Sequence, residues 1–338
     1  MDSVTQLVLG AAVGEAVLGR KVGNKAAIWG AVAGTLPDLD VFVPLGDAVR
    51  DFTYHRSASH SLFMLALVTP IMVWIIGKLH PAEAERRKQW MLLIYLVFVT
   101  HVLLDCFTVY GTQIFWPIST VPVGWSTIFI IDPLYTLPML LGVLTALVMT
   151  RQNHRGHLVS RAGLILSSLY LCWTVVAKTL VDTKFTDQLR AQGISYEKLL
   201  TVPAPFNSLL WRAVVMDQAG YYEAYSSVFD GESQIRFHHY ESHEDLLDGI
   251  EDSWSVKRLQ WFSKGFYAVS EWQSGVVIKD LRMGVEPHYA FQFKVAELSN
   301  PHARAVLPQR LPVVRDYARL PVFWQRIWDQ SVRLGPVQ

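Results

Sequence analysis

Residues 90–105 read WMLLIYLVFVTHVLLD, and His101 interrupts an otherwise apolar run. A helix rises about 1.5 Å per residue, so this run and its flanks can cross most of a hydrocarbon core about 30 Å thick. His101 and Asp105 are four residues apart, which places both side chains on one face of the helix. The stretch therefore predicts a membrane helix with a polar pair near its C-terminal end.

Further apolar stretches lie on both sides of this run. Three are long enough to span a membrane: residues 61–77, residues 162–177, and residues 133–149 within the longer stretch 117–150. Two more, residues 4–18 and 26–37, are shorter and rich in glycine and alanine, which let helices approach closely. The pattern predicts an α-helical polytopic membrane bundle of about six hydrophobic helices, two of them short.

The composition of the whole chain agrees with a membrane protein. Of its 338 residues, 51% are hydrophobic and 17% are charged, whereas soluble domains carry about 25% charged residues. The net charge of +1 provides no general attraction for polyanions, so nucleic acid is not an expected partner. Cys106 and Cys172 are the only cysteines, which excludes a disulfide framework or a cysteine-based zinc knuckle.

Lysine and arginine cluster on alternate loops between the predicted helices. The three clusters are Arg20, Lys21 and Lys25; Lys78, Arg86, Arg87 and Lys88; and Arg151, Arg155 and Arg161. The positive-inside rule assigns these loops to the cytoplasm. Residues 38–60, residues 105–130 and everything after about residue 182 are then outside. For a bacterium, this predicts a multi-pass protein of the inner (plasma) membrane whose outer face points to the periplasm or the exterior.

Aspartate and histidine make up most of the polar residues that interrupt the apolar pattern. They are Asp38, Asp40, His55, His60, His101 and Asp105, and Asp132 opens a later helix. Counted from the nearest inner basic residue, the helical members lie about 20–28 Å along their helices, in the outer part of the core. Ionisable groups are costly inside a membrane, so a shared depth indicates a shared purpose. All of these residues except Asp132 are predicted to bind a divalent metal. Zn²⁺ is the best candidate, and Mn²⁺ and Fe²⁺ are the alternatives.

Such a site suits hydrolysis, because a bound metal lowers the pKa of water and yields hydroxide at neutral pH. A nearby carboxylate can serve as a general base, and a guanidinium can hold an anionic group of a substrate. The predicted catalytic residues are accordingly Asp38, Asp132 and Arg56.

Each of these residues also has a structural interpretation. Asp132 precedes Pro133, a pattern typical of a helix N-cap followed by proline at the first helical position. His101 and Asp105 could form a polar pair between helices. Glu15 lies near the inner end of its helix and is interpreted as a packing residue, not a ligand. The occurrence of the other groups at one depth favours the metal site.

At these positions the sequence resembles the YdjM-like family of bacterial inner-membrane metal-dependent hydrolases. The matching elements are Pro37-Asp-Leu-Asp40, His55-Arg56 with His60-Ser61, His101-x-x-x-Asp105, Tyr110-Gly-Thr-Gln113, Asp132-Pro-Leu-Tyr135 and, in the second half, Pro205-Phe-Asn-Ser-Leu-Leu-Trp-Arg212. That family is similar to the zinc phospholipase C and nuclease superfamily, all-α enzymes whose zinc clusters cleave phosphoesters. The resemblance therefore implies phosphoester hydrolysis.

Gln6 is a departure from the family pattern. Many relatives carry a histidine near the N-terminus where this chain has Gln6. Its depth places it at the outer end of its helix, where it is expected to face the site. Since an amide is a poor zinc ligand, one or two ions are expected here.

The second half of the chain has a different pattern after residue 182. Residues 178–200 are predicted to form a helix, and alternating, aromatic-rich runs predict antiparallel strands at 209–216, 221–229, 234–240, 266–270, 276–281 and 289–296. Residues 243–264 are predicted to be partly helical, 301–321 irregular and 323–333 a terminal helix. The predicted domains are a membrane-embedded helical domain with the metal site (1–181), an extracytoplasmic α+β domain with an antiparallel sheet (182–300) and a Pro- and Arg-rich tail (301–338).

Three functions compete on these grounds. The favoured one is a membrane-bound hydrolase that uses metal-activated water at the outer face to cleave a phosphoester in a lipid-linked or amphiphilic substrate, with membrane lipids around it. A cation-coupled transporter is the first alternative, but transporters place their sites near the midplane and often show repeats, and this sequence shows no repeat. A non-catalytic membrane scaffold is the second, and it predicts no loss when His101 or Asp105 is replaced. The substrate and the oligomeric state stay open.

Overall fold

The computed structural model describes residues 1–149, 154–231, 233–299, 302–313 and 317–334. Arg151 of the third basic cluster lies outside these residues, as do parts of the predicted tail 301–338. The chain forms two compact units: unit 1 comprises Met1–Val43 and His55–Thr174, and unit 2 comprises Pro44–Tyr54 and Val175–Gln338. Unit 1 is helical, and unit 2 contains the sheets.

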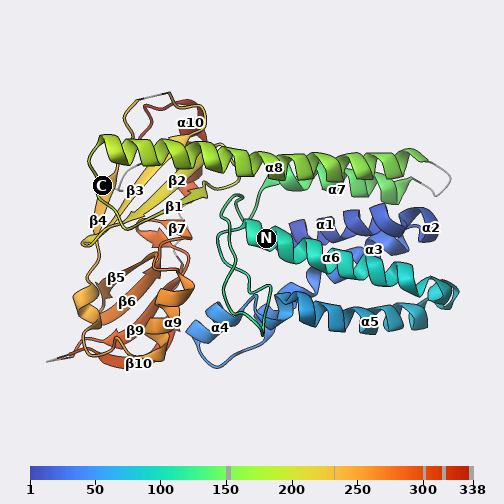
Figure 1. The fold of residues 1–338 in the computed structure, drawn as a ribbon, viewed down its shortest axis with the longest axis horizontal. Coiled ribbons are helices and arrows are strands. Elements are labelled where there is room, and N and C mark those ends of the chain that lie inside the picture. The colour runs from blue at the N-terminus through green and yellow to red at the C-terminus, as the bar shows by residue number, and fades with distance from the viewer. Residues whose placement is uncertain (150–153, 232, 300–301, 314–316, 335–338) are drawn as a thin grey trace. The chain divides into compact units, whose positions relative to one another are not determined.

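Unit 1 is a bundle whose helices follow the apolar runs (Figure 1). Its elements are α1 (Ser3–Gly14), the π-helical η1 (Glu15–Gly19), α2 (Arg20–Val22), α3 (Lys25–Thr35), the 3-10 helices η2 (Pro37–Phe42), η3 (Ala58–His60) and η4 (Pro81–Arg86), and the helices α5 (Leu62–Leu79), α6 (Arg87–Phe107), α7 (Pro133–Val148) and the first part of α8 (His154–Ala191). Side-chain caps start several of them. Asp2 accepts from the backbone of α1, Ser61 from that of α5 and Asp132 from that of α7.

Three segments are long and apolar enough to cross a membrane: Leu62–Leu79, Pro81–Phe107 and Arg155–Ala191. The helix Pro133–Val148 is apolar but shorter. These four contain or closely follow the four long runs of the sequence, so the prediction of a helical membrane part is confirmed. The predicted count of six membrane helices is not confirmed, because only the three segments above meet the length and hydropathy of a span among the described residues. The helix α3 has 11 residues and reaches only roughly 17 Å at about 1.5 Å per residue, whereas α1, η1 and α2 follow one another without a break from Ser3 to Val22.

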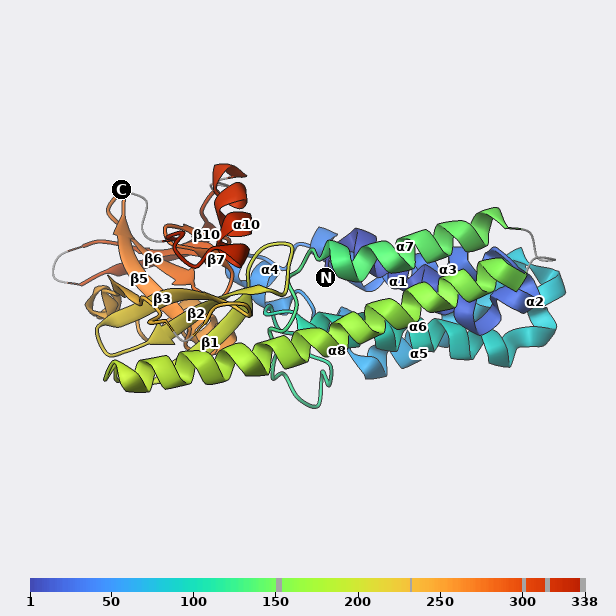
Figure 2. The ribbon, with the colours of Figure 1, turned by 90° about the horizontal axis from the view of Figure 1, so that it is seen from above.

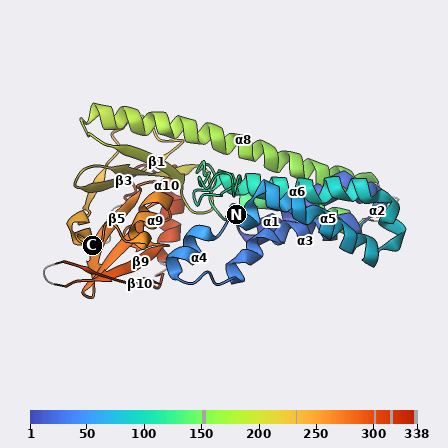
Figure 3. The ribbon, with the colours of Figure 1, turned by 60° about the horizontal axis from the view of Figure 1, so that its bottom comes forward.

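Glycine holds α1 against α3 inside the bundle (Figure 3). A Cβ atom added to Gly10 would come within 2.2 Å of the carbonyl oxygen of Gly30, and one added to Gly14 within 2.2 Å of that of Ala26. The two backbones thus touch where any larger side chain would separate them. This contact sets the position of Gly34 at the end of α3, which matters for the site below.

Unit 2 contains two four-stranded antiparallel sheets, and the prediction of antiparallel strands is confirmed. The first has the order β1-β2-β3-β4, made of β1 (Lys198–Pro203), β2 (Leu210–Met216), β3 (Gly220–Ser227) and β4 (His238–Glu241). The second has the order β10-β9-β6-β5, made of β5 (Tyr267–Trp272), β6 (Gly275–Asp280), β9 (Gln292–Glu297) and β10 (Arg304–Arg310). A small pair, β7 (Gly284–Val285) and β8 (His288–Tyr289), and the helices η5 (Glu244–Leu247), α9 (Trp254–Phe262), η6 (Tyr317–Arg319) and α10 (Leu320–Trp328) complete the unit.

Two helices from earlier in the chain pack within unit 2. The C-terminal part of α8 runs beside the first sheet (Figure 2) and buries Val181, Phe185 and Leu189, which are spaced by four residues along one face. The short helix α4 (Ala48–Tyr54) buries Phe52 against the rings of Phe262 and Phe293, with centroids 4.9 Å and 5.2 Å away. The chain therefore passes from unit 1 to unit 2 after Val43, returns after Tyr54, and passes again after Thr174.

Two predictions about unit 2 are wrong. The helix predicted over 178–200 ends at Ala191, because Gly193 takes a positive φ of 65° and the backbone N–H of Ile194 closes the turn on Leu189. The segment that follows is a strand, β1. Residues 301–321 were expected to be irregular but contain β10, an edge strand that accommodates Pro308 through a register shift between Ala305 and Gln309.

Candidate metal centre

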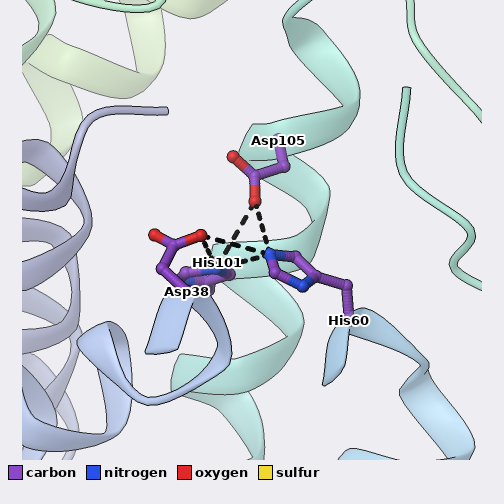
Figure 4. Close-up of side chains that lie close together, drawn as sticks. All are labelled: Asp38, His60, His101 and Asp105. Atoms are coloured by element: carbon purple, nitrogen blue, oxygen red, sulfur yellow. Dashed lines mark hydrogen bonds and ion pairs between the residues drawn. The ribbon is translucent and has the colours of Figure 1, made fainter. Parts of the chain in front are cut away.

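Two histidines and two aspartates meet at one end of the helical unit (Figure 4). Asp38 comes from η2, His60 from η3, and His101 and Asp105 from the C-terminal half of α6. Each offers one nitrogen or oxygen atom, and these four atoms all lie within 4.8 Å of one another. His60, His101 and Asp105 are buried, while the side chain of Asp38 is 16% exposed. We refer to these four residues as the cluster.

The distances within the cluster converge on the Nε2 atoms of the two histidines. His60 Nε2 lies 3.1 Å from Asp105 Oδ2, 3.3 Å from Asp38 Oδ1 and 3.3 Å from His101 Nε2. His101 Nε2 lies 3.4 Å from Asp105 Oδ2 and 3.8 Å from Asp38 Oδ1. The four atoms therefore surround a common centre.

Hydrogen bonds on the far side of each ring fix which nitrogen faces the cluster. His101 Nδ1 lies 2.7 Å from the carbonyl oxygen of Gly34, which can only accept, so Nδ1 carries the proton. His60 Nδ1 lies 2.9 Å from Ser59 Oγ, and this hydroxyl donates to Asp40 Oδ2. The hydroxyl must therefore accept from His60 Nδ1. In their neutral forms, both rings present an Nε2 lone pair to the cluster, as metal-ligating histidines do.

Asp105 is oriented in a similar way. Its Oδ1 accepts from Gln6 Nε2 at 3.1 Å, from the amino nitrogen of Met1, and pairs with Arg56 Nη1 at 3.2 Å. Its Oδ2 points at the two histidines, and no described group outside the cluster donates a hydrogen bond to it. One oxygen of this carboxylate is thus held by three donors, which leaves the other for the cluster.

These residues fit a divalent metal ion. A zinc ion with ligand distances of about 2.0–2.1 Å has its tetrahedral ligand atoms roughly 3.3 Å apart, and the five distances above run from 3.1 to 3.8 Å. Two imidazole lone pairs facing each other repel unless a cation lies between them. Two carboxylates balance a charge of +2. The set of two nitrogen and two oxygen donors suits zinc, manganese or iron.

Asp40 and His55, both predicted as ligands, lie beside the cluster and contact each other. Asp40 Oδ1 lies 2.7 Å from His55 Nδ1, and its Oδ2 accepts from the backbone N–H of Arg56 at 3.1 Å. Burial raises the pKa of Asp40, but the hydrogen bond and positive charge of His55 outweigh it and lower the pKa to about 2. The pKa of Asp38 is also lowered, because its hydrogen bond to His60 and its electrostatic interaction with His101 outweigh burial. Both carboxyls are therefore ionised at neutral pH.

Arg56 packs against the cluster from the Asp105 side. Besides the contact with Asp105, its guanidinium donates to Thr108 Oγ1 at 3.3 Å and lies 5.1 Å above the ring of Tyr110. Its side chain is only 4% exposed. Its backbone has a positive φ of 63°, an uncommon conformation that is often found at functional sites.

Asp132 is not part of the cluster. Its Oδ1 accepts from the backbone of Leu134 and Tyr135 at the start of α7, and its Oδ2 accepts from the hydroxyl of Tyr170 at 2.8 Å. Burial outweighs these hydrogen bonds and raises the pKa of Asp132. The N-cap interpretation describes this geometry, and a catalytic role for Asp132 stays a prediction. Glu15 also lies apart, paired with His157 Nδ1 at 2.5 Å.

The sequence pattern did not single out Gly34 or Ser59. Ser59 directly precedes His60, and a hydroxyl next to a ligating histidine is a signal that could have been noticed. The carbonyl of Gly34 could not have been found in this way, because its position depends on how α3 packs against α6. Gln6 was expected to face the site, and its amide indeed contacts Asp105.

Comparisons with known proteins cover the first half of the chain. Residues 1–181 match the family model described as YdjM inner membrane protein. The uncharacterized protein YfhP of Bacillus subtilis (strain 168) is 32% identical over 140 residues, which are 39% of this chain and 42% of YfhP. The match thus spans less than half of the length of that curated relative. No solved structure gives a significant match.

Proposed function

The chain belongs to the YdjM inner membrane protein family, and on that premise we propose that it is a membrane-bound, metal-dependent hydrolase. The observation that carries the proposal is the cluster of Asp38, His60, His101 and Asp105, whose ligand atoms lie within 4.8 Å of one another next to membrane-spanning helices. A buried set of two carboxylates and two imidazoles is costly unless it binds a cation. Such a set therefore requires a functional explanation.

The residues of the cluster have distinct proposed roles. A divalent metal ion, when bound, lowers the pKa of a coordinated water and supplies hydroxide for attack. His60 and His101 bind through Nε2, and Asp105 binds through Oδ2. Asp38 is the most exposed of the four, and its Oδ2 has no hydrogen-bond partner among the described residues. We assign to Asp38 Oδ2 the role of accepting the proton of the attacking water.

The residues around the cluster orient it. Ser59 and Asp40 fix the tautomer of His60. The carbonyl of Gly34 fixes the tautomer of His101. Gln6 and Arg56 orient the carboxylate of Asp105. Because Arg56 is nearly buried and already contacts Asp105, we propose that it positions that ligand and offsets its charge. Binding of a substrate anion by Arg56, as the sequence suggested, would require it to leave these contacts.

We further propose that the substrate is a phosphoester in a lipid-linked or amphiphilic molecule. A site next to membrane-spanning helices favours a substrate that is itself held in the bilayer, with membrane lipids as neighbours. Phosphoester cleavage is what the resemblance to the zinc phospholipase C and nuclease superfamily implies.

The cluster is proposed to face the periplasm or the exterior. The helix α5 begins two residues after His60 and ends next to Lys78, while α6 begins at Arg87 and reaches Asp105 near its other end. The basic residues thus lie at the opposite ends of these helices from the cluster. The positive-inside rule then assigns the cluster to the outer side.

The test is metal analysis of the purified full-length protein in detergent, followed by assays with phosphomonoesters and phosphodiesters. We expect about one bound zinc, manganese or iron ion per chain, lost in His60→Ala and His101→Ala and kept in the control His243→Ala, whose side chain is exposed. Hydrolysis should be lost in the same two variants. Absence of bound metal after supplementation would contradict the metal site, and metal binding without any hydrolysis would contradict the enzyme.

A further inference from the structure

A cavity of about 350 Å³ in unit 2 is lined by eight polar or basic residues together with Tyr225, Ile235, Val332 and Leu334. It lies between Tyr225 of β3, residues 233–238 at the start of β4, Arg326 of α10 and residues 330–334. All of its lining residues belong to unit 2, whereas Asp38, His60, His101 and Asp105 belong to unit 1. Its volume is within the range of small-molecule sites.

The charged side chains that line the cavity are all basic. Arg236, His238, Arg326 and Arg333 line the cavity, and no described lining residue is an aspartate or glutamate. The chain as a whole has 30 lysines and arginines against 29 aspartates and glutamates. The imbalance is therefore a local property of this cavity.

Arg326, one of the lining residues, is held in place by an ion pair. Its side chain is 7% exposed, and its guanidinium donates to both oxygens of Asp230, at 2.8 Å and 2.6 Å. This ion pair holds the guanidinium in place and accounts for the charge of Arg326. Arg236 and Arg333 are exposed, and neither forms an ion pair with a described residue.

We propose that this cavity binds a phosphate group carried by a small molecule or by a lipid headgroup. Two guanidinium forks can each donate two parallel hydrogen bonds to phosphate oxygens. The amide of Gln330 also lines the cavity, and its nitrogen has a second N–H besides the one that it donates to Ser233, whereas the hydroxyl of Ser331 donates to Asp329. A phosphate dianion accepts more hydrogen bonds and carries more charge than a carboxylate, so it matches this donor set better.

The nearby aromatic side chains favour the lipid source. Trp328 of α10 is 60% exposed and stacks on Phe229, which is 59% exposed, with ring centroids 5.2 Å apart. Exposed tryptophans on a short amphipathic helix are typical of a surface that contacts lipid headgroups. The inference does not depend on the proposed hydrolase activity.

The test is a calorimetric titration of the full-length protein in detergent with three ligands: inorganic phosphate, glycerol phosphate and a short-chain phosphatidic acid. We expect saturable binding that is weakened about tenfold or more in the double variant Arg236→Gln, Arg333→Gln. The matched control removes the same charge from two exposed arginines outside the cavity, Arg190→Gln with Arg304→Gln, and should leave the affinity unchanged. Binding to phosphatidic acid alone assigns the lipid source, and binding to the soluble phosphates assigns the free one.

A second arm separates this site from the cluster. The variant His60→Ala should retain phosphate binding, because His60 does not line the cavity. Equal loss of affinity in the two double variants would overturn the proposal, as would loss in His60→Ala with the cavity variant unaffected. Absence of saturable binding by any of the three ligands would overturn it as well.

Discussion

At the scale of single residues, Ser59 connects Asp40 to His60. In Ser59→Ala the Nδ1 proton of His60 loses its acceptor, and the ring can rotate or change tautomer. We expect the affinity for zinc to fall about 10- to 100-fold, as is typical when such a partner of a metal ligand is removed. Competition with a calibrated chelator measures this change.

The variant Ser59→Thr is the matched control, because it keeps the hydroxyl at the same position. It should retain most of the zinc affinity of the unmutated protein. If Ser59→Ala binds zinc as tightly as Ser59→Thr does, the hydrogen bond through Ser59 does not orient His60.

The protonation of His60 predicts how metal binding depends on pH. Burial lowers the pKa of His60, but the hydrogen bonds that Nε2 of the protonated ring donates to Asp105 and Asp38 outweigh this effect and raise the pKa above its ordinary value. A histidine must be neutral to bind a metal, so protons compete with the ion below that pKa. We expect zinc affinity to fall as the pH is lowered from about 8 to about 5, and zinc uptake to release protons. Chelator competition across that range would refute this if the affinity did not change.

The sequence could predict which residues lie near the site, but not which of them form the cluster and which lie beside it. Counting helix rise placed Asp38, His60, His101 and Asp105 at one depth, and they do lie together. The same count could not separate them from Asp40 and His55, because depth says nothing about rotation around the helix axis or about side-chain rotamers. Whether any of the six binds a metal stays a prediction.

At the scale of elements, the contact between α1 and α3 depends on glycine. In Gly30→Ala, the new Cβ would lie 2.2 Å from the carbonyl oxygen of Gly10, so the two helices must separate. Forcing extra volume into such a contact costs about 1–3 kcal/mol, and we expect a lower melting temperature. Since Gly34 at the end of α3 holds His101, the bound metal should also become easier to remove.

Gly77 provides the control for this prediction. It also lies in a helix, α5, but a Cβ added there would meet nothing within 4 Å. Gly77→Ala should leave the melting temperature unchanged or raise it slightly, because alanine is the better helix former. Equal effects of the two substitutions would show that the close approach of α1 and α3 does not stabilise the bundle.

The elements that hydropathy defined were predicted well, and those that depend on tertiary contacts were not. The helices α5, α6 and α7 follow the apolar runs closely. The strand β10 contains Pro308 and many exposed residues, so its sequence resembles a loop, and only pairing with β9 makes it a strand. The helix α4 has seven residues, too few for a periodic pattern to be recognised.

At the scale of the whole molecule, Phe52 of α4 is a core residue of unit 2. It is 5% exposed and also lies 4.3 Å from the ring of Phe291, and Arg258 donates to Thr53 Oγ1 at 3.0 Å. Replacement of a buried phenylalanine by alanine costs about 3–5 kcal/mol. We expect Phe52→Ala in the full-length protein to speed the hydrogen exchange of β6 and β9 amides. Phe229→Ala removes a ring that is 59% exposed and should have a smaller effect.

The orientation of the chain can be tested at the same scale. A phosphatase reporter that is active only outside the cytoplasm, fused after residue 338, should be active, because residues after about 182 are proposed to lie outside. A fluorescent reporter that folds only in the cytoplasm should be dark at the same position. The reverse pattern would overturn the proposed orientation of the cluster.

The place of α4 in unit 2 has a consequence for the order in which the protein is made. The segment 44–54 connects Asp40 to His55, yet Phe293, a packing partner of Phe52, leaves the ribosome roughly 240 residues later, about 10–50 s at common rates of synthesis. During that delay, α4 has no core in which to bury Phe52. Asp38 and His60 of the cluster lie on either side of this segment in the sequence, so we expect them to reach their final places only after β9 has been made. Assembly of the site is therefore expected to finish late in the synthesis of the chain.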